Sequence, residues 1–211
     1  MTEPRLLPGH RRSAAVAIVA VLAALVVAAL GVRYAGASEP GRVDARIAGA
    51  LYGVEPPWRS VALAMDSLGE PVGAAALVVP IVAGCLLLRR PRAAAFVVVG
   101  VGSAVGTATL LKHLAGRTIH GDNLSYPSGH TAFATSLALV VAMVATRRAA
   151  GTLFVFAAAL VVGAVMGWAQ VALGAHYPTD VLGGWCTALA VVPATAWLVD
   201  RTADQLRRSR P

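Results

Sequence analysis

Charged residues are scarce in this sequence. Asp, Glu, Lys and Arg make up 13% of its 211 residues, which is about half of their share in a soluble domain. Hydrophobic residues make up 57%, and the mean hydropathy is +0.70. A soluble core of this size does not need so many apolar side chains, whereas a helix that crosses a bilayer must be apolar toward lipid. The composition therefore indicates an integral membrane protein.

Cysteine is also scarce. Cys85 and Cys186 both lie within apolar runs, so the sequence offers no cysteine spacing typical of a metal site and no support for a disulfide. The net charge of +8 is compatible with nucleic-acid binding. However, the basic residues flank apolar runs, which is the pattern of membrane topology signals. We therefore expect no nucleic-acid partner and no bound metal.

Long apolar runs separated by polar segments predict a polytopic, all-α membrane protein. We predict six membrane-spanning helices, at residues 14–32, 72–88, 93–114, 129–145, 152–173 and 181–199. The first run follows basic residues and resembles a secretory signal peptide, with residues 35–37 as a possible cleavage site. It is longer than a typical signal core, so we interpret it as a retained helix.

The Lys and Arg residues are distributed unevenly between the two predicted sides. Six spans place both termini on one side, which carries twelve Lys and Arg residues, including Arg147 and Arg148, against six on the other side. The positive-inside rule then places both termini in the cytoplasm. Residues 36–60 fall on the outer side, where Val43, Ile47 and Leu51 recur every four residues. We expect a short amphipathic helix on the membrane surface there.

Polar residues concentrate in two segments on the predicted outer side, residues 116–128 and 174–180. In the second, His176 and Asp180 are four residues apart, so they share one face of a helical turn. A histidine whose second ring nitrogen is held by a carboxylate is a competent nucleophile for phosphoryl transfer. His130 is the candidate acid that protonates the leaving oxygen.

Phosphate-binding groups are expected beside these residues. Ser128 and Gly129 precede the fourth span, and a helix N-terminus is a natural anion site. Lys112 and Arg117 supply positive charge. Gln170 lies within an apolar run, where a polar side chain needs a partner, and it either binds phosphate or hydrogen-bonds within the bundle.

These motifs resemble those of the type 2 phosphatidic acid phosphatase superfamily. The string Pro127-Ser128-Gly129-His130 matches the second family motif, His176 and Asp180 match the end of the third, and Lys112 opens the first. The resemblance covers Lys112 through Asp180 and the six-helix layout. It implies a fold shared with vanadate haloperoxidases, a phosphohistidine on His176, His130 as general acid, and no cofactor.

The chain departs from the family pattern at both motif arginines. Ile119 and His120 stand where the first motif has Arg-Pro, and Ala169-Gln170 stand where the third has Ser-Arg. We hypothesise that Arg117, with Gln170 or His120, partly replaces them, whereas the alternative is a severely impaired enzyme. Unchanged phosphate affinity in Arg117→Ala would contradict the hypothesis. A less positive pocket favours a monoester over a diphosphate.

The sequence therefore predicts one catalytic domain, residues 1–211, in the cell membrane. Its expected reaction is metal-independent dephosphorylation of a lipid phosphate in the outer leaflet. By resemblance, the candidate substrates are phosphatidic acid, phosphatidylglycerol phosphate, and polyprenyl phosphates or diphosphates. The alternatives are a lipid phosphotransferase that uses the same phosphohistidine, a catalytically silent lipid-phosphate binder, and a small transporter. The oligomeric state is left open.

Overall fold

The computed structural model describes residues 6, 10–145 and 150–208, and it is almost entirely helical. The helices are α1 (His10–Arg33), α2 (Arg42–Leu51), α3 (Trp58–Gly69), α4 (Pro71–Leu87), α5 (Pro91–Ala115), α6 (Gly129–Ala145), α7 (Ala150–Ala172) and α8 (Pro178–Arg208). A two-stranded antiparallel ribbon, β1 (Thr118–Ile119) and β2 (Asn123–Leu124), joins α5 to α6. The predicted topology signal at Arg147 and Arg148 lies outside the described residues.

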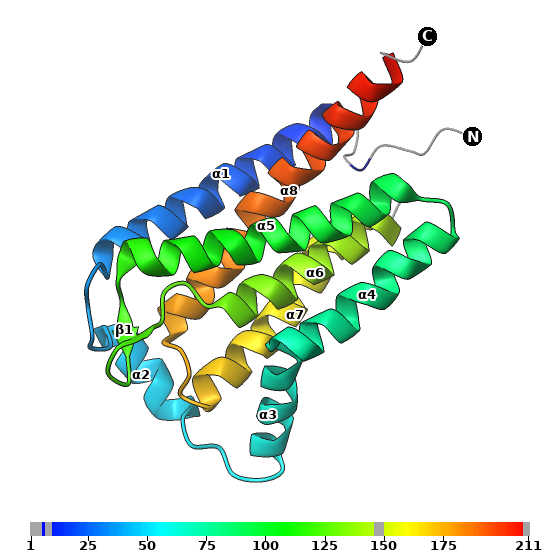
Figure 1. Ribbon diagram of the computed structural model, residues 1–211. Coiled ribbons are helices and arrows are strands. Elements are labelled where there is room, and N and C mark those ends of the chain that lie inside the picture. Colours follow the sequence, from blue (N-terminus) through cyan, green and yellow to red (C-terminus); the bar gives the residue numbers. More distant parts are fainter. Residues whose placement is uncertain (1–5, 7–9, 146–149, 209–211) are drawn as a thin grey trace.

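Helices α5, α6, α7 and α8 pack on one another as the centre of the bundle. Helix α1 runs along α8, α4 packs against α5, and α3 packs against α7. Figure 1 shows that α1 begins and α8 ends at the same end of the bundle. The ribbon, α2 and α3 gather at the opposite end. Every loop that carries a predicted site residue reaches this second end.

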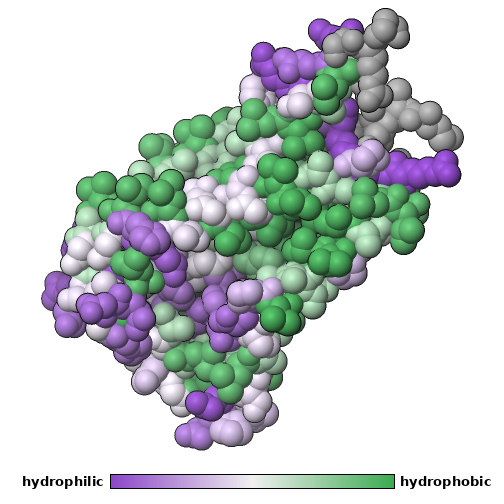
Figure 2. All heavy atoms as spheres, in the orientation of Figure 1, coloured by the Kyte–Doolittle hydropathy of each residue, from purple (hydrophilic) through white to green (hydrophobic). Residues whose placement is uncertain are grey.

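The chain is a multi-pass membrane protein. In the part of the chain that the structure describes, α1, α5, α7 and α8 are long and apolar enough to cross a bilayer, and α3 with α4 forms a fifth candidate that bends by 65°. Exposed apolar side chains such as Ile18, Leu25 and Leu160 cover the middle of the bundle. Figure 2 shows this apolar surface between two polar ends.

Each of the six predicted spans corresponds to a helix, but the number of spans stays a prediction. The second and fourth predicted spans fall on α4 and α6, which have 17 residues each. That length is at the lower limit for crossing a typical hydrocarbon core. Cys85 and Cys186 are both free thiols.

Close approach of the helices at the site depends on two glycines. A Cβ atom at Gly184 of α8 would overlap the main chain of Ser128 at the start of α6, and a Cβ atom at Gly167 of α7 would overlap Val181 of α8. Small residues allow helix backbones to approach closely in lipid. The Gly184 contact brings the starts of α6 and α8 together, and both starts carry predicted catalytic residues, while the Gly167 contact brings α7 against the start of α8.

The opposite end of the bundle is held by a separate ion-pair cluster. Arg92 at the start of α5 is buried, and its guanidinium contacts Asp200 at 3.2 Å and Asp204 at 3.3 Å, both on α8. This cluster holds α5 to α8 far along α8 from the predicted site residues, which lie at the start of that helix.

Candidate active site

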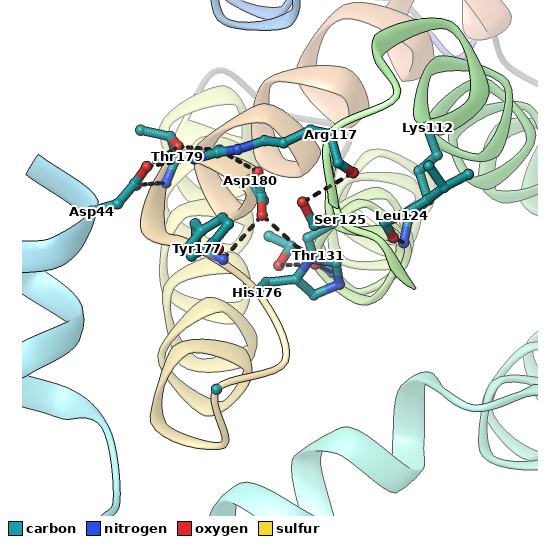
Figure 3. Close-up of polar contacts among 12 residues, drawn as sticks. Asp44, Lys112, Arg117, Leu124, Ser125, Thr131, His176, Tyr177, Thr179 and Asp180 are labelled. Atoms are coloured by element: carbon teal, nitrogen blue, oxygen red, sulfur yellow. Dashed lines mark hydrogen bonds and ion pairs between the residues drawn. The ribbon is translucent and has the colours of Figure 1, made fainter. Parts of the chain in front are cut away.

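The predicted nucleophile lies in the loop that joins α7 to α8. His176 is 8% exposed, and its Nδ1 lies 3.8 Å from Oδ2 of Asp180, in the first turn of α8. The main-chain N–H of Tyr177 donates to the same oxygen at 3.0 Å. The four-residue spacing thus brings the imidazole and the carboxylate face to face, as Figure 3 shows. The 3.8 Å separation is longer than a hydrogen bond, and such contacts often tighten when substrate binds.

The surroundings of His176 favour its neutral form. Burial lowers the pKa of the imidazole, and the charges of Lys112 and His130 lower it further, whereas Asp180 raises it. A neutral imidazole has a free lone pair on one ring nitrogen, which a nucleophile requires. Because Nδ1 faces Asp180, the lone pair falls on Nε2.

Arg117 lies beside the catalytic pair with no exposed surface. Its Nη1 donates to Asp180 Oδ1 at 2.6 Å and to Thr179 Oγ1 at 2.7 Å, and its Nη2 donates to Asp44 Oδ2 at 2.7 Å. The guanidinium lies over the Tyr34 ring at 4.0 Å and over the Tyr177 ring at 4.4 Å. Its charge is therefore engaged within the protein, and its predicted contact with phosphate stays a prediction.

The start of α6 is joined to the main chain of Asp180, at the start of α8, by a hydrogen bond. The N–H of Ser128 donates to the Asp180 carbonyl at 2.9 Å. The Ser128 hydroxyl accepts from the N–H of Thr131 at 3.3 Å, as a helix-capping side chain does. Gly129 and His130 follow in the first helical turn and are partly exposed. Their N–H groups belong to the unpaired donors of a helix start.

His130 faces two carboxylates, Asp66 in the last turns of α3 and Glu70 at the bend between α3 and α4. Its Nε2 lies 3.5 Å from Asp66 Oδ1 and 3.5 Å from Glu70 Oε1. These carboxylates are the acidic neighbours of the predicted proton donor. The ligand atoms of these three residues lie within 4.8 Å of one another, a spacing that also fits a cation. A cation on Nε2 would displace the proton that His130 is predicted to donate.

Lys112 and Gln170 are both held by protein partners. Lys112 Nζ donates to the Leu124 carbonyl at 3.1 Å, which leaves two of its three N–H donors. Gln170 is buried, and its Nε2 donates to Asp66 at 2.8 Å. The main-chain carbonyl of Gln170 accepts a hydrogen bond from the main-chain N–H of His176 at 3.3 Å. This bond helps to fix the loop that carries His176. The structure places both residues around the site, and their phosphate contacts stay predictions.

Asp66 and Asp44 carried no predicted role, although both contact residues of this site. Asp66 interrupts an apolar stretch, which is itself a signal of function. Asp44 is a charged residue between Val43 and Ile47 of the predicted surface helix. In the structure Val43 and Ile47 are 59% and 41% exposed, whereas Asp44 is fully buried against Arg117.

Gly69 at the end of α3 packs directly against the His130 ring, and a Cβ atom there would overlap His130 Cδ2. We expect Gly69→Ala to displace the ring and to lower kcat for phosphate release by about 10- to 100-fold, since small misplacements of catalytic groups have effects of this size. The matched control is Gly84→Ala on α4, where an added Cβ meets no atom within 4 Å. Equal activity of the two variants would show that His130 does not need this position.

Comparisons with known proteins give a family match and a similar fold. The family description "PAP2 superfamily" matches residues 93–204. The fold is similar to the crystal structure of a transmembrane PAP2-type phosphatidylglycerolphosphate phosphatase from Bacillus subtilis, with a TM-score of 0.70 and 24% sequence identity. The match covers 90% of this chain and 98% of the other. A search of curated proteins found no match.

Proposed function

Because this chain belongs to the PAP2 superfamily and is a phosphatase, we propose that it hydrolyses a membrane lipid phosphate through a phosphohistidine on His176. The observation that carries this proposal is the arrangement of His176, Asp180 and His130. The buried, neutral imidazole of His176 faces the Asp180 carboxylate. The imidazole of His130, beside two carboxylates, lies close enough for its charge to act on His176. That arrangement supplies a nucleophile, its orienting group and a proton donor.

The reaction proceeds in two steps. In the first, His176 Nε2 attacks phosphorus, the ester P–O bond breaks, and the leaving oxygen takes the proton from His130. In the second, neutral His130 takes a proton from water, the resulting hydroxide attacks phosphorus, and the P–N bond breaks to release inorganic phosphate. Asp180 stabilises the positive charge that develops on the His176 ring. The steps use only side chains and water.

Five groups are proposed to bind the phosphate oxygens. Lys112 contributes positive charge, and the Ser128 and Gly129 region contributes the start of α6. Gln170 and Arg117 complete the predicted set, provided that substrate exchanges for some of their present partners. With so little free positive charge, the site favours a phosphomonoester over a diphosphate.

The lipid part of the substrate would lie along the bundle. We propose six spans, cytoplasmic termini, and a site at the outer leaflet of the cell membrane. The positive-inside pattern supports this orientation, and so does the common end at which α1 begins and α8 ends. Residues 1–211 then form one catalytic unit, in which the acyl chains contribute binding energy and hold the phosphate at headgroup level.

A panel of lipid phosphates tests the proposed function. Phosphate release by the detergent-purified protein is expected from phosphatidic acid or phosphatidylglycerol phosphate, the second being the substrate after which the Bacillus subtilis phosphatase is named. A polyprenyl monophosphate and its diphosphate complete the panel. Preference for the diphosphate would contradict the proposed monoester selectivity. If the folded protein releases no phosphate from any lipid, the hydrolase proposal fails.

A further inference from the structure

Asp44 is a buried carboxylate on α2, outside all three family motifs. Its side chain accepts four hydrogen bonds. The N–H of Thr179 donates to Oδ1 at 2.9 Å, while Arg117 Nη2 at 2.7 Å, the Thr179 hydroxyl at 2.9 Å and the N–H of Gly41 at 3.2 Å donate to Oδ2. A carboxylate with no exposed surface needs such compensation. Asp44 thus connects the surface helix to Arg117 and to the residue before the catalytic Asp180.

We propose that Asp44 is a positioning residue: by engaging Arg117 Nη2, it prevents Arg117 from pairing with both oxygens of Asp180, so that Oδ2 stays available to His176. In the structure the two Nη groups of Arg117 are divided between the two carboxylates. Arg117 touches Asp180 through Nη1 and Oδ1, and its other Nη group goes to Asp44. Asp180 Oδ2 is left to the Tyr177 N–H and to His176.

The alternative pairing is the usual preference of arginine. A guanidinium beside a single carboxylate commonly forms two parallel hydrogen bonds, one to each oxygen. In Asp44→Asn one of the two accepting oxygens becomes an N–H2 donor, and loss of the negative charge weakens the contact that holds the fully buried Arg117 Nη2. Turning toward Asp180 Oδ2 would satisfy it. The same turn would remove the oxygen that orients His176 and stabilises its charge.

The rings of Tyr34 and Tyr177 make this arrangement sensitive to small changes. The centres of both rings lie within 4.4 Å of the Arg117 guanidinium carbon. Because the two rings confine the guanidinium, the carboxylate to which each Nη group donates depends on which acceptors lie within reach. Asp44 and Asp180 are both fully buried. One cation therefore serves two competing buried anions, and a change in either anion alters its contact with the other.

The kinetic test uses Asp44→Asn and rests on the proposed phosphatase activity. We expect kcat for release from a short-chain phosphatidic acid in detergent micelles to fall by about 30-fold, with KM changed less than about threefold, because misplacing a catalytic group acts on the chemical step. The matched control is Asp200→Asn, which removes a carboxylate from the buried Arg92 far from the site. It should lower thermal stability while leaving kcat within about twofold of wild type. Equal kcat for Asp44→Asn and Asp200→Asn would overturn the inference.

A second measurement does not depend on turnover. The imidazole of His176 faces Asp180 on α8, Lys112 on α5 and His130 on α6. When Arg117 neutralises both Asp180 oxygens, the His176 ring loses stabilisation of its protonated form. NMR titration of labelled histidines should therefore show a lower pKa for His176 in Asp44→Asn and an unchanged one in Asp200→Asn. An unmoved titration in Asp44→Asn would overturn the inference even if the wild type proved inactive, whereas inactivity alone would count against only the proposed function.

A milder variant covers the case in which Asp44→Asn does not fold. The Thr179 hydroxyl accepts from Arg117 and donates to Asp44, and Thr179→Val removes it without leaving a charge unpaired. We expect kcat to fall by about threefold with KM unchanged and with a lower His176 pKa, since one of the contacts that hold Arg117 is lost. Wild-type values of both kcat and the pKa in Thr179→Val would contradict the positioning role.

Discussion

Replacing His176 with asparagine is expected to eliminate phosphate release, with a fall in kcat of at least about 10⁴-fold, because without the nucleophile only substrate binding and electrostatics remain. Asparagine keeps much of the size of the ring, so the surrounding loop should persist. The measurement is release of inorganic phosphate from phosphatidic acid by purified protein. The thermal stability of each variant should be measured alongside it.

The matched control for His176→Asn is His113→Asn. His113 is exposed on α5, and its ring forms a hydrogen bond with the Thr109 carbonyl of its own helix. Its replacement should leave kcat within about twofold of wild type, as is usual for exposed positions away from special features. Substantial phosphate release by His176→Asn would show that another group attacks phosphorus.

Replacing His130 with asparagine is expected to have an effect that depends on the leaving group. For a lipid phosphate, whose alkoxide needs a proton, kcat should fall by about 10²- to 10⁴-fold, which is the usual contribution of general acid catalysis. For p-nitrophenyl phosphate, whose phenolate leaves without a proton, the fall in the first step should be much smaller. Asp66 and Glu70, whose oxygens each lie 3.5 Å from His130 Nε2, are the acidic groups next to this ring.

Comparison of the two substrates separates the roles of the histidines. His176→Asn should lose activity on both substrates, whereas His130→Asn should retain a measurable burst of p-nitrophenolate. Formation of the phosphoenzyme releases this product before water attack, which also involves His130. Absence of this burst in His130→Asn, with the first step slowed equally on both substrates, would contradict its assignment as the acid for the leaving oxygen.

The apolar runs located most of the helices closely. Residues 129–145 were predicted as a span and match α6 (Gly129–Ala145), and residues 72–88 correspond to α4 (Pro71–Leu87). In both cases an apolar run is bounded by residues with strong local preferences, such as Pro71 and Pro127-Ser128. Helix α8 continues past its predicted end at residue 199 because its later turns are amphipathic and pack through Asp200 and Asp204 on Arg92.

The sequence predicted the local pair of catalytic residues better than the contacts between distant parts of the chain. The pairing of His176 with Asp180 follows from helical periodicity, and the structure brings them together. The contacts of Asp44 with Arg117 and of Asp66 with Gln170 join residues 73 and 104 positions apart, so no local period reveals them. Both depend on how α2 and α3 pack against the ends of α7 and α8.

Chemical trapping of the phosphorylated enzyme examines the proposed role of His176. The wild-type protein would be mixed with phosphatidic acid carrying labelled phosphate, denatured in alkaline detergent, and digested. We predict label that is stable to alkali and labile to acid, as a phosphohistidine is, on the peptide that contains His176. No label should appear on His176→Asn. Rapid phosphate release by the wild type without any labelled protein, or label on a peptide that lacks His176, would contradict the proposed mechanism.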